Sequence, residues 1–267
     1  RRAMNAEAGW QPGWDLAGTI EVAAANGSPS VGSRVVGFVP NGAWKEVVAV
    51  PTHSLAELPE SVTFAQAATL PVAGLTALHA LAKAGSLLDR KVLITGASGG
   101  VGNFACQLAR LSGATVVAHV RNPQFEASVK QTGAHIVVTG DDLSVASEYG
   151  PYDLILESVG GTTLSTALSL IALDGMCVLF GTSANKDVTF NAQKFYSTGG
   201  ASLYGFILFH ELKREPASVG LKRLVNLVAQ GQIRPHIDVE APWTQVAEVA
   251  EQLTQRRFAG KAVLHFS

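Results

Sequence analysis

The stretch Lys91–Gly102, KVLITGASGGVG, constrains the fold more than any other part of the chain. It opens with the apolar run Val92–Ile94, which is typical of a strand buried in a parallel sheet. Apolar residues then recur at helical spacing over Val101–Leu111. The pattern therefore predicts a turn between a strand and the start of a helix, and this turn contains three glycines: Gly96, Gly99 and Gly102.

These glycines have the spacing of a dinucleotide-binding turn. Gly96 permits the tight turn, Gly99 lets the backbone approach a pyrophosphate, and Gly102 lets the helix pack close to the sheet. Free N–H groups at the start of the helix would face the anion. We therefore expect the cofactor to contact most of the turn, namely Gly96, Ser98, Gly99, Gly100, Val101 and Gly102.

The same letters admit a second interpretation, because Gly96–Gly100 also fits the G-x-S-x-G elbow of a serine hydrolase with Ser98 as nucleophile. An acid and a histidine later in the chain would complete a triad. Gly102 has no role in such an elbow and a clear one beside a dinucleotide, so the cofactor interpretation is favoured. The candidates for the triad are Asp153, Asp174 or Asp238 with His210, His236 or His265.

Composition narrows the class of partner. The chain has 267 residues, 47% of them hydrophobic, which is enough for two domains with cores of their own. A net charge of -1 and the absence of a basic cluster favour a small-molecule substrate over nucleic acid. No apolar stretch has membrane-spanning length, and Arg1–Met4 lacks the apolar core of a signal peptide, so we expect no membrane partner and a cytoplasmic location. Cys106 and Cys177 are interpreted as reduced core residues.

The segments before the glycine turn form a small β-rich unit. Strands are predicted at Trp14–Val22, Arg34–Val39 and Ala43–Val50, separated by Gly and Pro turns. A helical stretch follows, with Ser61 as its N-cap, and Pro71 divides it before a second helix.

Beyond the glycine turn, short apolar strands alternate with helices, as a doubly wound parallel sheet requires. The remaining tail is mixed, and its last strand is expected to return to the β-rich unit. The predicted strands are Thr115–Val120, His135–Val138, Asp153–Leu156, Met176–Phe180, Ser202–Phe209 and Lys261–Phe266, and the predicted helices are Pro123–Thr132, Thr162–Ala172, Pro216–Gln230 and Trp243–Arg256.

Several segments together resemble the zinc-independent, quinone-oxidoreductase-like branch of the medium-chain dehydrogenase/reductase family. They occur in the family's order and spacing over essentially the whole chain. The segments are PGWDLAG (Pro12–Gly18), VGSRVVGF (Val31–Phe38), GLTAL (Gly74–Leu78), ITGASGGVG (Ile94–Gly102), LFGT (Leu179–Thr182) and GKAVL (Gly260–Leu264).

The resemblance implies an α/β fold in which a GroES-like substrate domain is split by a Rossmann domain, with hydride transfer from NADPH in the cleft between them. We place the partial GroES-like domain at residues 1–70 and 212–267 and the Rossmann domain at 71–211. The family's chains start well before Pro12, so the opening strands of the substrate domain have no counterpart here. No catalytic acid or base is assigned for that reason.

Arg121 ends the second predicted strand, 19 residues after Gly102, where a NAD enzyme carries an acid for the ribose 2′-OH. An arginine there can pair bidentately with a 2′-phosphate, which favours NADPH as the cofactor. The alternative is a solvated surface arginine. Asn122 is expected to add a hydrogen bond.

Further candidates end the fourth and fifth strands, at the edge where open α/β sheets bind ligands. Ordinary strand-end turns would use the same residue types, so both interpretations stay open. By resemblance, Val159 would lie near the cofactor ribose, and Thr182, Thr76 and Phe206 near the nicotinamide. The strand-end candidates are Ser158, Val159, Gly181 and Thr182.

Metal ligands are not expected. Zinc-dependent members of the family carry a His–Glu pair where this chain has Trp14–Asp15, and two cysteines cannot supply a structural zinc lobe.

The sequence therefore predicts an NADPH-dependent reductase of quinones or α,β-unsaturated carbonyls. The alternatives are a truncated member that binds NADPH or a partner without redox turnover, and the Ser98 hydrolase. The apolar stretch Ser202–Phe209 at a sheet edge predicts a homodimer.

Overall fold

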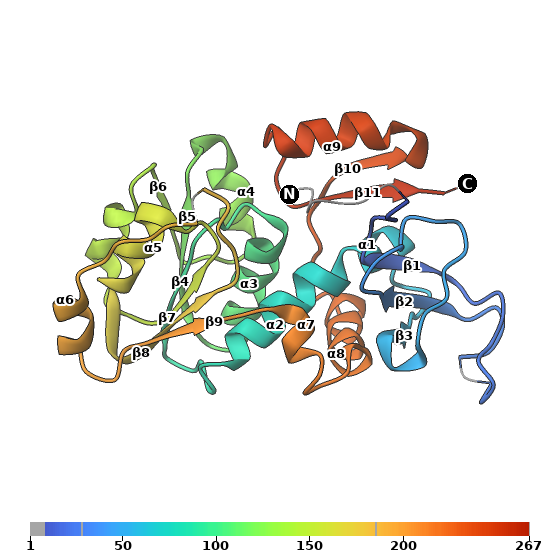
Figure 1. The fold of residues 1–267 in the computed structure, drawn as a ribbon, viewed down its shortest axis with the longest axis horizontal. Helices are drawn as coiled ribbons and strands as arrows, with labels where there is room; N and C mark the ends of the chain where they lie inside the picture. Colours follow the sequence, from blue (N-terminus) through green and yellow to red (C-terminus); the bar gives the residue numbers. More distant parts are fainter. Residues whose placement is uncertain (1–8, 28, 185, 267) are drawn as a thin grey trace. The chain divides into compact units, whose positions relative to one another are not determined.

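The computed structural model describes residues 9–27, 29–184 and 186–266, and the chain divides into two compact units (Figure 1). Unit 1 holds the residues up to Thr76 and those from Leu208 onward, and unit 2 is Ala77–Ile207. The sequence-based boundaries, after residues 70 and 211, fall six residues before and four residues after these division points. Arg1–Met4, inspected for a signal peptide, lies outside the described residues.

Unit 2 is built on a sheet of six strands that are all parallel to their neighbours. β4 is the first strand of this sheet along the chain, but it lies between β5 and β7. The strand order therefore reverses beside β4, as in a Rossmann fold. The predicted doubly wound sheet is confirmed. Its spatial order is β6 (Ile136–Thr139), β5 (Thr115–Val120), β4 (Lys91–Ile94), β7 (Tyr152–Glu157), β8 (Ile171–Leu179) and β9 (Ser202–Gly205).

Helices connect these strands, and α3 packs against β4 and β5 (Figure 1). The strand register places Leu93, Val117, Ile155 and Cys177 next to one another on one face, where they pack with η4 and α5 into a core. Cys177 is thus a core residue, as expected. The helical segments are α2 (Leu75–Ala82), α3 (Gly100–Leu111), η3 (Pro123–Phe125), α4 (Glu126–Gln131), η4 (Leu143–Tyr149), α5 (Gly161–Leu168) and α6 (Ala192–Ser197).

Unit 1 contains two small sheets. The antiparallel sheet has the order β1 (Asp15–Thr19), β2 (Arg34–Phe38), β3 (Leu55–Glu57), and β10 (Ile237–Pro242) pairs in parallel with β11 (Lys261–His265). The last strand, β11, therefore lies in unit 1, and its partner strand is β10. Lys261 at the start of β11 also forms an ion pair with Asp15 on β1, with 3.0 Å between Nζ and the carboxylate. The helical segments are η1 (Thr52–Ser54), α1 (Phe64–Ala68), η2 (Leu70–Gly74), α7 (Leu208–Glu211), α8 (Ala217–Ala229), η5 (Trp243–Gln245) and α9 (Val246–Thr254).

The strand predicted at Ala43–Val50 is wrong. Bends cover Trp44–Val47, and although Ala43 is buried, Trp44 and Val47 remain 47% and 67% exposed, so a strand here would have no continuous buried face. The third strand of the sheet is instead β3, where Leu55 and Ala56 are buried and α8 packs against the strand. The segment forms a strand because it is buried against a helix that is distant in the sequence. The local pattern of residues does not contain this information.

The entry into the first helix also differs from the prediction. Thr63, and not Ser61, is the N-cap of α1. Its hydroxyl accepts the Gln66 N–H at 3.1 Å while the Gln66 side chain accepts the Thr63 N–H at 3.0 Å, a reciprocal capping box. At Pro71 the chain makes the π-helical turn η2, which leaves the Val72 N–H to donate to Asp15 Oδ1 at 2.8 Å.

Two predicted elements in unit 2 end early. The strand predicted over Ser202–Phe209 stops at Gly205, and the chain then enters the short helix α7. The helix predicted to reach Ala172 ends at Leu168, because β8 already begins at Ile171. In both places an apolar run spans the junction between two elements, and hydrophobicity alone does not mark the boundary.

Candidate functional site: the carboxyl edge of the parallel sheet

The loops that follow β4, β7 and β8 lie together, and we call residues 95–99, 158–160 and 180–184 the carboxyl edge. Backbone hydrogen bonds connect them to one another and to the neighbouring strand ends. The bonds are Thr95 N–H to Leu156 O at 3.0 Å, Phe180 N–H to Glu157 O at 3.0 Å, Ser183 N–H to Ser158 O at 3.1 Å and Ala184 N–H to Val159 O at 2.8 Å.

The backbone of the glycine turn is closely constrained at Gly96 and Gly102. Gly96 has a φ of +59°, which favours glycine, and its carbonyl accepts the Gly99 N–H at 2.9 Å. A Cβ on Gly102 would lie 2.6 Å from Ala97 Cα, so only glycine lets α3 approach the turn this closely. Gly99 is the N-cap of α3 and provides no side-chain cap, which leaves the first N–H groups of the helix suited to an anion.

Ser158 joins the glycine turn to the end of β8. A Cβ on Gly96 would lie 2.7 Å from Ser158 Oγ, and a Cβ on Gly181 would lie 3.0 Å from the Ser158 carbonyl oxygen. The three predicted residues Gly96, Ser158 and Gly181 are therefore brought into contact. The glycine turn and the loops after β7 and β8 therefore meet at Ser158.

Glu157 lies directly before the 158–160 loop of this edge, and the sequence analysis did not identify it. It is the last residue of β7 and is fully buried. Its Oε1 accepts the Val159 N–H at 2.8 Å and the Thr95 hydroxyl at 3.1 Å, and its Oε2 accepts the Gly160 N–H at 3.0 Å. Burial raises the pKa of this carboxyl, although the hydrogen bonds oppose the shift. The sequence feature that could have identified Glu157 is an acidic residue directly after the apolar run Leu154–Leu156.

Arg121 and Asn122 follow β5. The Arg121 side chain is 54% exposed, and its Nε lies 3.9 Å from a carboxylate oxygen of Asp141, which is itself 92% exposed. Such a long, exposed ion pair holds the guanidinium weakly, so a phosphate could displace it. Asn122 Oδ1 accepts the Gln124 N–H at 3.1 Å and caps η3, so this oxygen has a structural role.

The other predicted residues lie in different surroundings. Ser98, Gly100 and Val101 are half-buried in the glycine turn and the first turn of α3, and Val159 is half-buried in the loop after β7. Thr182 is exposed, whereas Phe206 is buried and extends the edge because its N–H donates to Leu179 O at 2.8 Å. Thr76 is buried in the first turn of α2 and belongs to unit 1, so the structure does not group it with the others.

The hydrolase interpretation finds no support in the turn. A nucleophile elbow holds its serine in a strained backbone conformation. Among the described non-glycine residues, positive φ occurs only at Asp89, Asp174 and Arg256, and Ser98 is not one of them. Asp153 lies at the amino end of β7, where it binds the Lys91 N–H, so it lies at the opposite edge of the sheet from Ser98.

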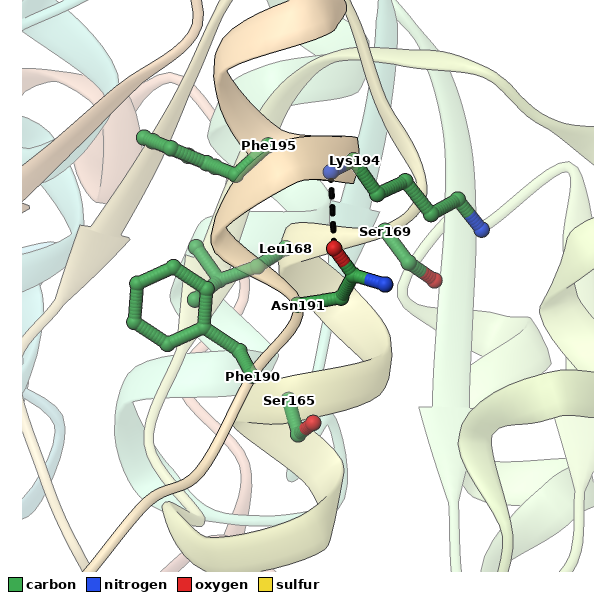
Figure 2. A pocket seen from close by; sticks show the side chains of 7 residues that line it. All are labelled: Ser165, Leu168, Ser169, Phe190, Asn191, Lys194 and Phe195. Atoms are coloured by element: carbon green, nitrogen blue, oxygen red, sulfur yellow. Dashed lines mark hydrogen bonds between the residues drawn. The ribbon is translucent and has the colours of Figure 1, made fainter.

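A shallow hollow elsewhere on unit 2 does not compete with the carboxyl edge. It lies between the C-terminal half of α5 and the segment entering α6, with a volume of about 180 Å³ including the solvent at its mouth, below the range of ligand pockets. Figure 2 shows the Lys194 ammonium pointing away from the Phe190 ring, while Asn191 Oδ1 accepts the Lys194 N–H at 2.9 Å and caps α6.

The histidines, cysteines and acidic residues do not form a cluster with the composition of a metal site in the described part of the chain. Within the described ranges, no three His, Cys, Asp or Glu side chains are grouped so that they could hold a metal ion. Cys106 and Cys177 are buried and form no disulfide, and burial raises the pKa of the Cys106 thiol to about 12. In the same described part of the chain, no helix is long and apolar enough to span a membrane.

Comparison with known proteins agrees with this geometry. The family model described as "Zinc-binding dehydrogenase" matches residues 100–223. A quinone oxidoreductase of Lama guanicoe is 30% identical, covering 96% of this chain and 79% of the relative, and a chloroplast envelope quinone oxidoreductase homolog of Arabidopsis thaliana is 31% identical, covering 95% and 79%. The structure of a mycobacterial protein complexed with NADPH has a TM-score of 0.83 at 28% identity, covering 94% of this chain and 81% of that one. This chain therefore belongs to the quinone-oxidoreductase-like branch of the medium-chain dehydrogenase/reductase family.

Proposed function

We propose that this protein is an NADPH-dependent oxidoreductase that delivers hydride to a quinone or an α,β-unsaturated carbonyl. The observation that carries the proposal is the carboxyl edge: three connected loops beside the start of α3, which has no side-chain cap, with an arginine at the end of the adjoining strand β5. This edge has the residues that a dinucleotide with a 2′-phosphate needs.

The chain's own residues bind and orient the cofactor, which supplies the hydride. The N–H groups at the start of α3 hold the pyrophosphate, because they have no side-chain acceptor. Arg121 pairs with the 2′-phosphate, and Asn122 adds a hydrogen bond. The remaining candidates in unit 2 orient the ribose and nicotinamide: Ser158, Val159, Gly181, Thr182 and Phe206.

The substrate class follows from the position where zinc-dependent relatives carry a His–Glu pair. This chain has Trp14 and Asp15 there. Both carboxylate oxygens of Asp15 accept structural hydrogen bonds, from the Val72 N–H at 2.8 Å and from Lys261 Nζ at 3.0 Å. Quinones and enones suit such a site, because the oxyanion formed from them is delocalised and hydrogen-bond donors suffice to stabilise it.

The test is NADPH oxidation by the wild-type protein with a quinone, an enone and a simple secondary ketone, each in the presence and absence of a chelator. We expect turnover with the quinone or the enone, little with the ketone, and no effect of the chelator. Preferential reduction of the ketone would contradict the proposed substrate class, and NADPH binding without any turnover would favour a redox-silent member of the family.

We also propose that the protein forms a homodimer through the free edge of β9. The edge strand β9 is short, and Leu203 on it is 42% exposed, so pairing of two such edges about a two-fold axis would cover an apolar side chain. Sedimentation of the wild type should give a dimer at micromolar concentration, and Leu203→Lys should shift it toward monomer. A monomeric wild type would contradict the proposal.

A further inference from the structure

The buried acid Glu157 lies beneath the loop 158–160 and has no role in the proposed chemistry. Its two oxygens face three hydrogen-bond donors: the Val159 N–H, the Gly160 N–H and the Thr95 hydroxyl. An ionised carboxylate can accept from all three, and it is fully shielded from solvent. A buried charge that is satisfied by directed donors fixes the positions of those donors.

Thr95 extends the same arrangement. Its hydroxyl oxygen accepts the Ser158 N–H at 3.1 Å, while the hydroxyl donates toward Glu157. Three consecutive backbone N–H groups, at Ser158, Val159 and Gly160, are therefore held by two side chains. One of these side chains comes from the loop after β4 and the other from the end of β7, so the pair also connects the two strand ends.

The hydrogen bonds made by the pair have two consequences for the carboxyl edge. Gly160 is the N-cap of α5, so Glu157 holds the residue from which that helix starts, through the Gly160 N–H. The pair also directs the N–H groups of the loop inward. The carbonyl groups of Ser158 and Val159 accept the Ser183 and Ala184 N–H groups at 3.1 and 2.8 Å, which connects the loop to the end of β8.

We infer that Glu157 and Thr95 are a positioning pair that holds the loop 158–160 in the shape in which the carboxyl edge binds NADPH. The inference rests on the proposed function. Neither side chain needs to touch the cofactor, because each acts through the backbone of the loop. Loss of either side chain should therefore weaken cofactor binding as well as the fold.

The direct test compares Glu157→Gln and Thr95→Val with wild type by fluorescence titration of NADPH. The glutamine NH₂ would face a backbone N–H, so one loop donor loses its acceptor, and valine leaves the Ser158 N–H without an acceptor. In the free variant the loop relieves the unpaired donor by changing its shape, and NADPH binding has to restore that shape. We therefore expect roughly tenfold weaker NADPH binding in each variant, about the cost of one unpaired buried donor. Thr95→Ser, which keeps the hydroxyl, should retain most of the affinity.

The matched control is Asp153→Asn at the other end of the same strand, where the carboxylate binds Arg90 and the Lys91 N–H. Thermal unfolding of every variant is recorded alongside the titrations. We expect the control to lose stability but to keep wild-type affinity for NADPH. Should Glu157→Gln not fold, the comparison of Thr95→Val with Thr95→Ser decides the question.

Wild-type affinity in Thr95→Val would overturn the inference, and so would an equal loss of affinity in Asp153→Asn. These outcomes leave NADPH binding by the wild type intact. A wild-type protein that does not bind NADPH would instead overturn the proposed function, and the inference with it.

Discussion

Strand β7 carries a carboxylate at each end, and the two have opposite properties. At the amino end, burial raises the pKa of Asp153, but the Lys91 N–H and the Arg90 guanidinium outweigh burial, and the pKa is lowered overall. At the carboxyl end, Glu157 is fully buried, and burial raises its pKa despite three hydrogen-bond donors. The amino-end acid ties β7 to β4, whereas the carboxyl-end acid holds a loop. Ligand binding should therefore depend on one end of the sheet and stability on both.

The largest expected effect is at the carboxyl end. Gly99→Val places a branched side chain at the N-cap of α3, where the pyrophosphate would lie, and should abolish NADPH binding while most of the fold is retained. The measurement is an NADPH titration beside a circular dichroism spectrum. A folded variant with unchanged affinity would refute the dinucleotide site.

Arg121→Ala should have the next largest effect. If the guanidinium pairs with the 2′-phosphate, its loss should reduce NADPH affinity by about 1.5–3 kcal/mol, the range for a hydrogen bond to a charged group, and leave NADH affinity nearly unchanged. Parallel titrations with the two nucleotides measure the selectivity. Equal losses for NADPH and NADH would mean that Arg121 does not recognise the phosphate.

At the amino end, Asp153→Asn should lower the free energy of unfolding by about 1–3 kcal/mol, because the Arg90 guanidinium and the Lys91 N–H lose a charged acceptor that is only 26% exposed. Denaturant unfolding of the variant and wild type measures this difference. A variant as stable as wild type would show that Asp153 does not stabilise the amino end of β7.

The smallest effect should appear in the pH dependence of stability. Burial lowers the pKa of His119, whose ring hydrogen-bonds to Gly140 O at 2.8 Å, so the unfolded chain takes up a proton more readily than the folded one. Stability from this residue is fully present above the unfolded value of 6.5 and is lost as the pH falls below it. His119→Gln should therefore flatten the stability profile as the pH falls below 6.5, which denaturant unfolding at a series of pH values measures. His135, whose pKa burial also lowers, is present in both proteins and cancels in the difference.

The sequence predicted the parallel sheet and the glycine turn because both follow from local patterns: a short apolar run, a turn that needs glycine, and an amphipathic helix. The prediction failed where contacts between residues far apart in the chain determine the local structure. Leu55–Glu57 becomes a strand because a helix more than 150 residues later in the chain packs against it, and Val47 does not because nothing covers it. Glu157 was overlooked because its role depends on Thr95, 62 residues away, and only the folded sheet brings the two together.

We propose above that the carboxyl edge of unit 2 binds NADPH. The most direct test is a fluorescence titration of the wild-type protein with NADPH and, separately, with NADH. We predict saturable NADPH binding and markedly weaker NADH binding, because only NADPH offers Arg121 a 2′-phosphate. Absence of NADPH binding, or equal affinity for the two nucleotides, would contradict the account.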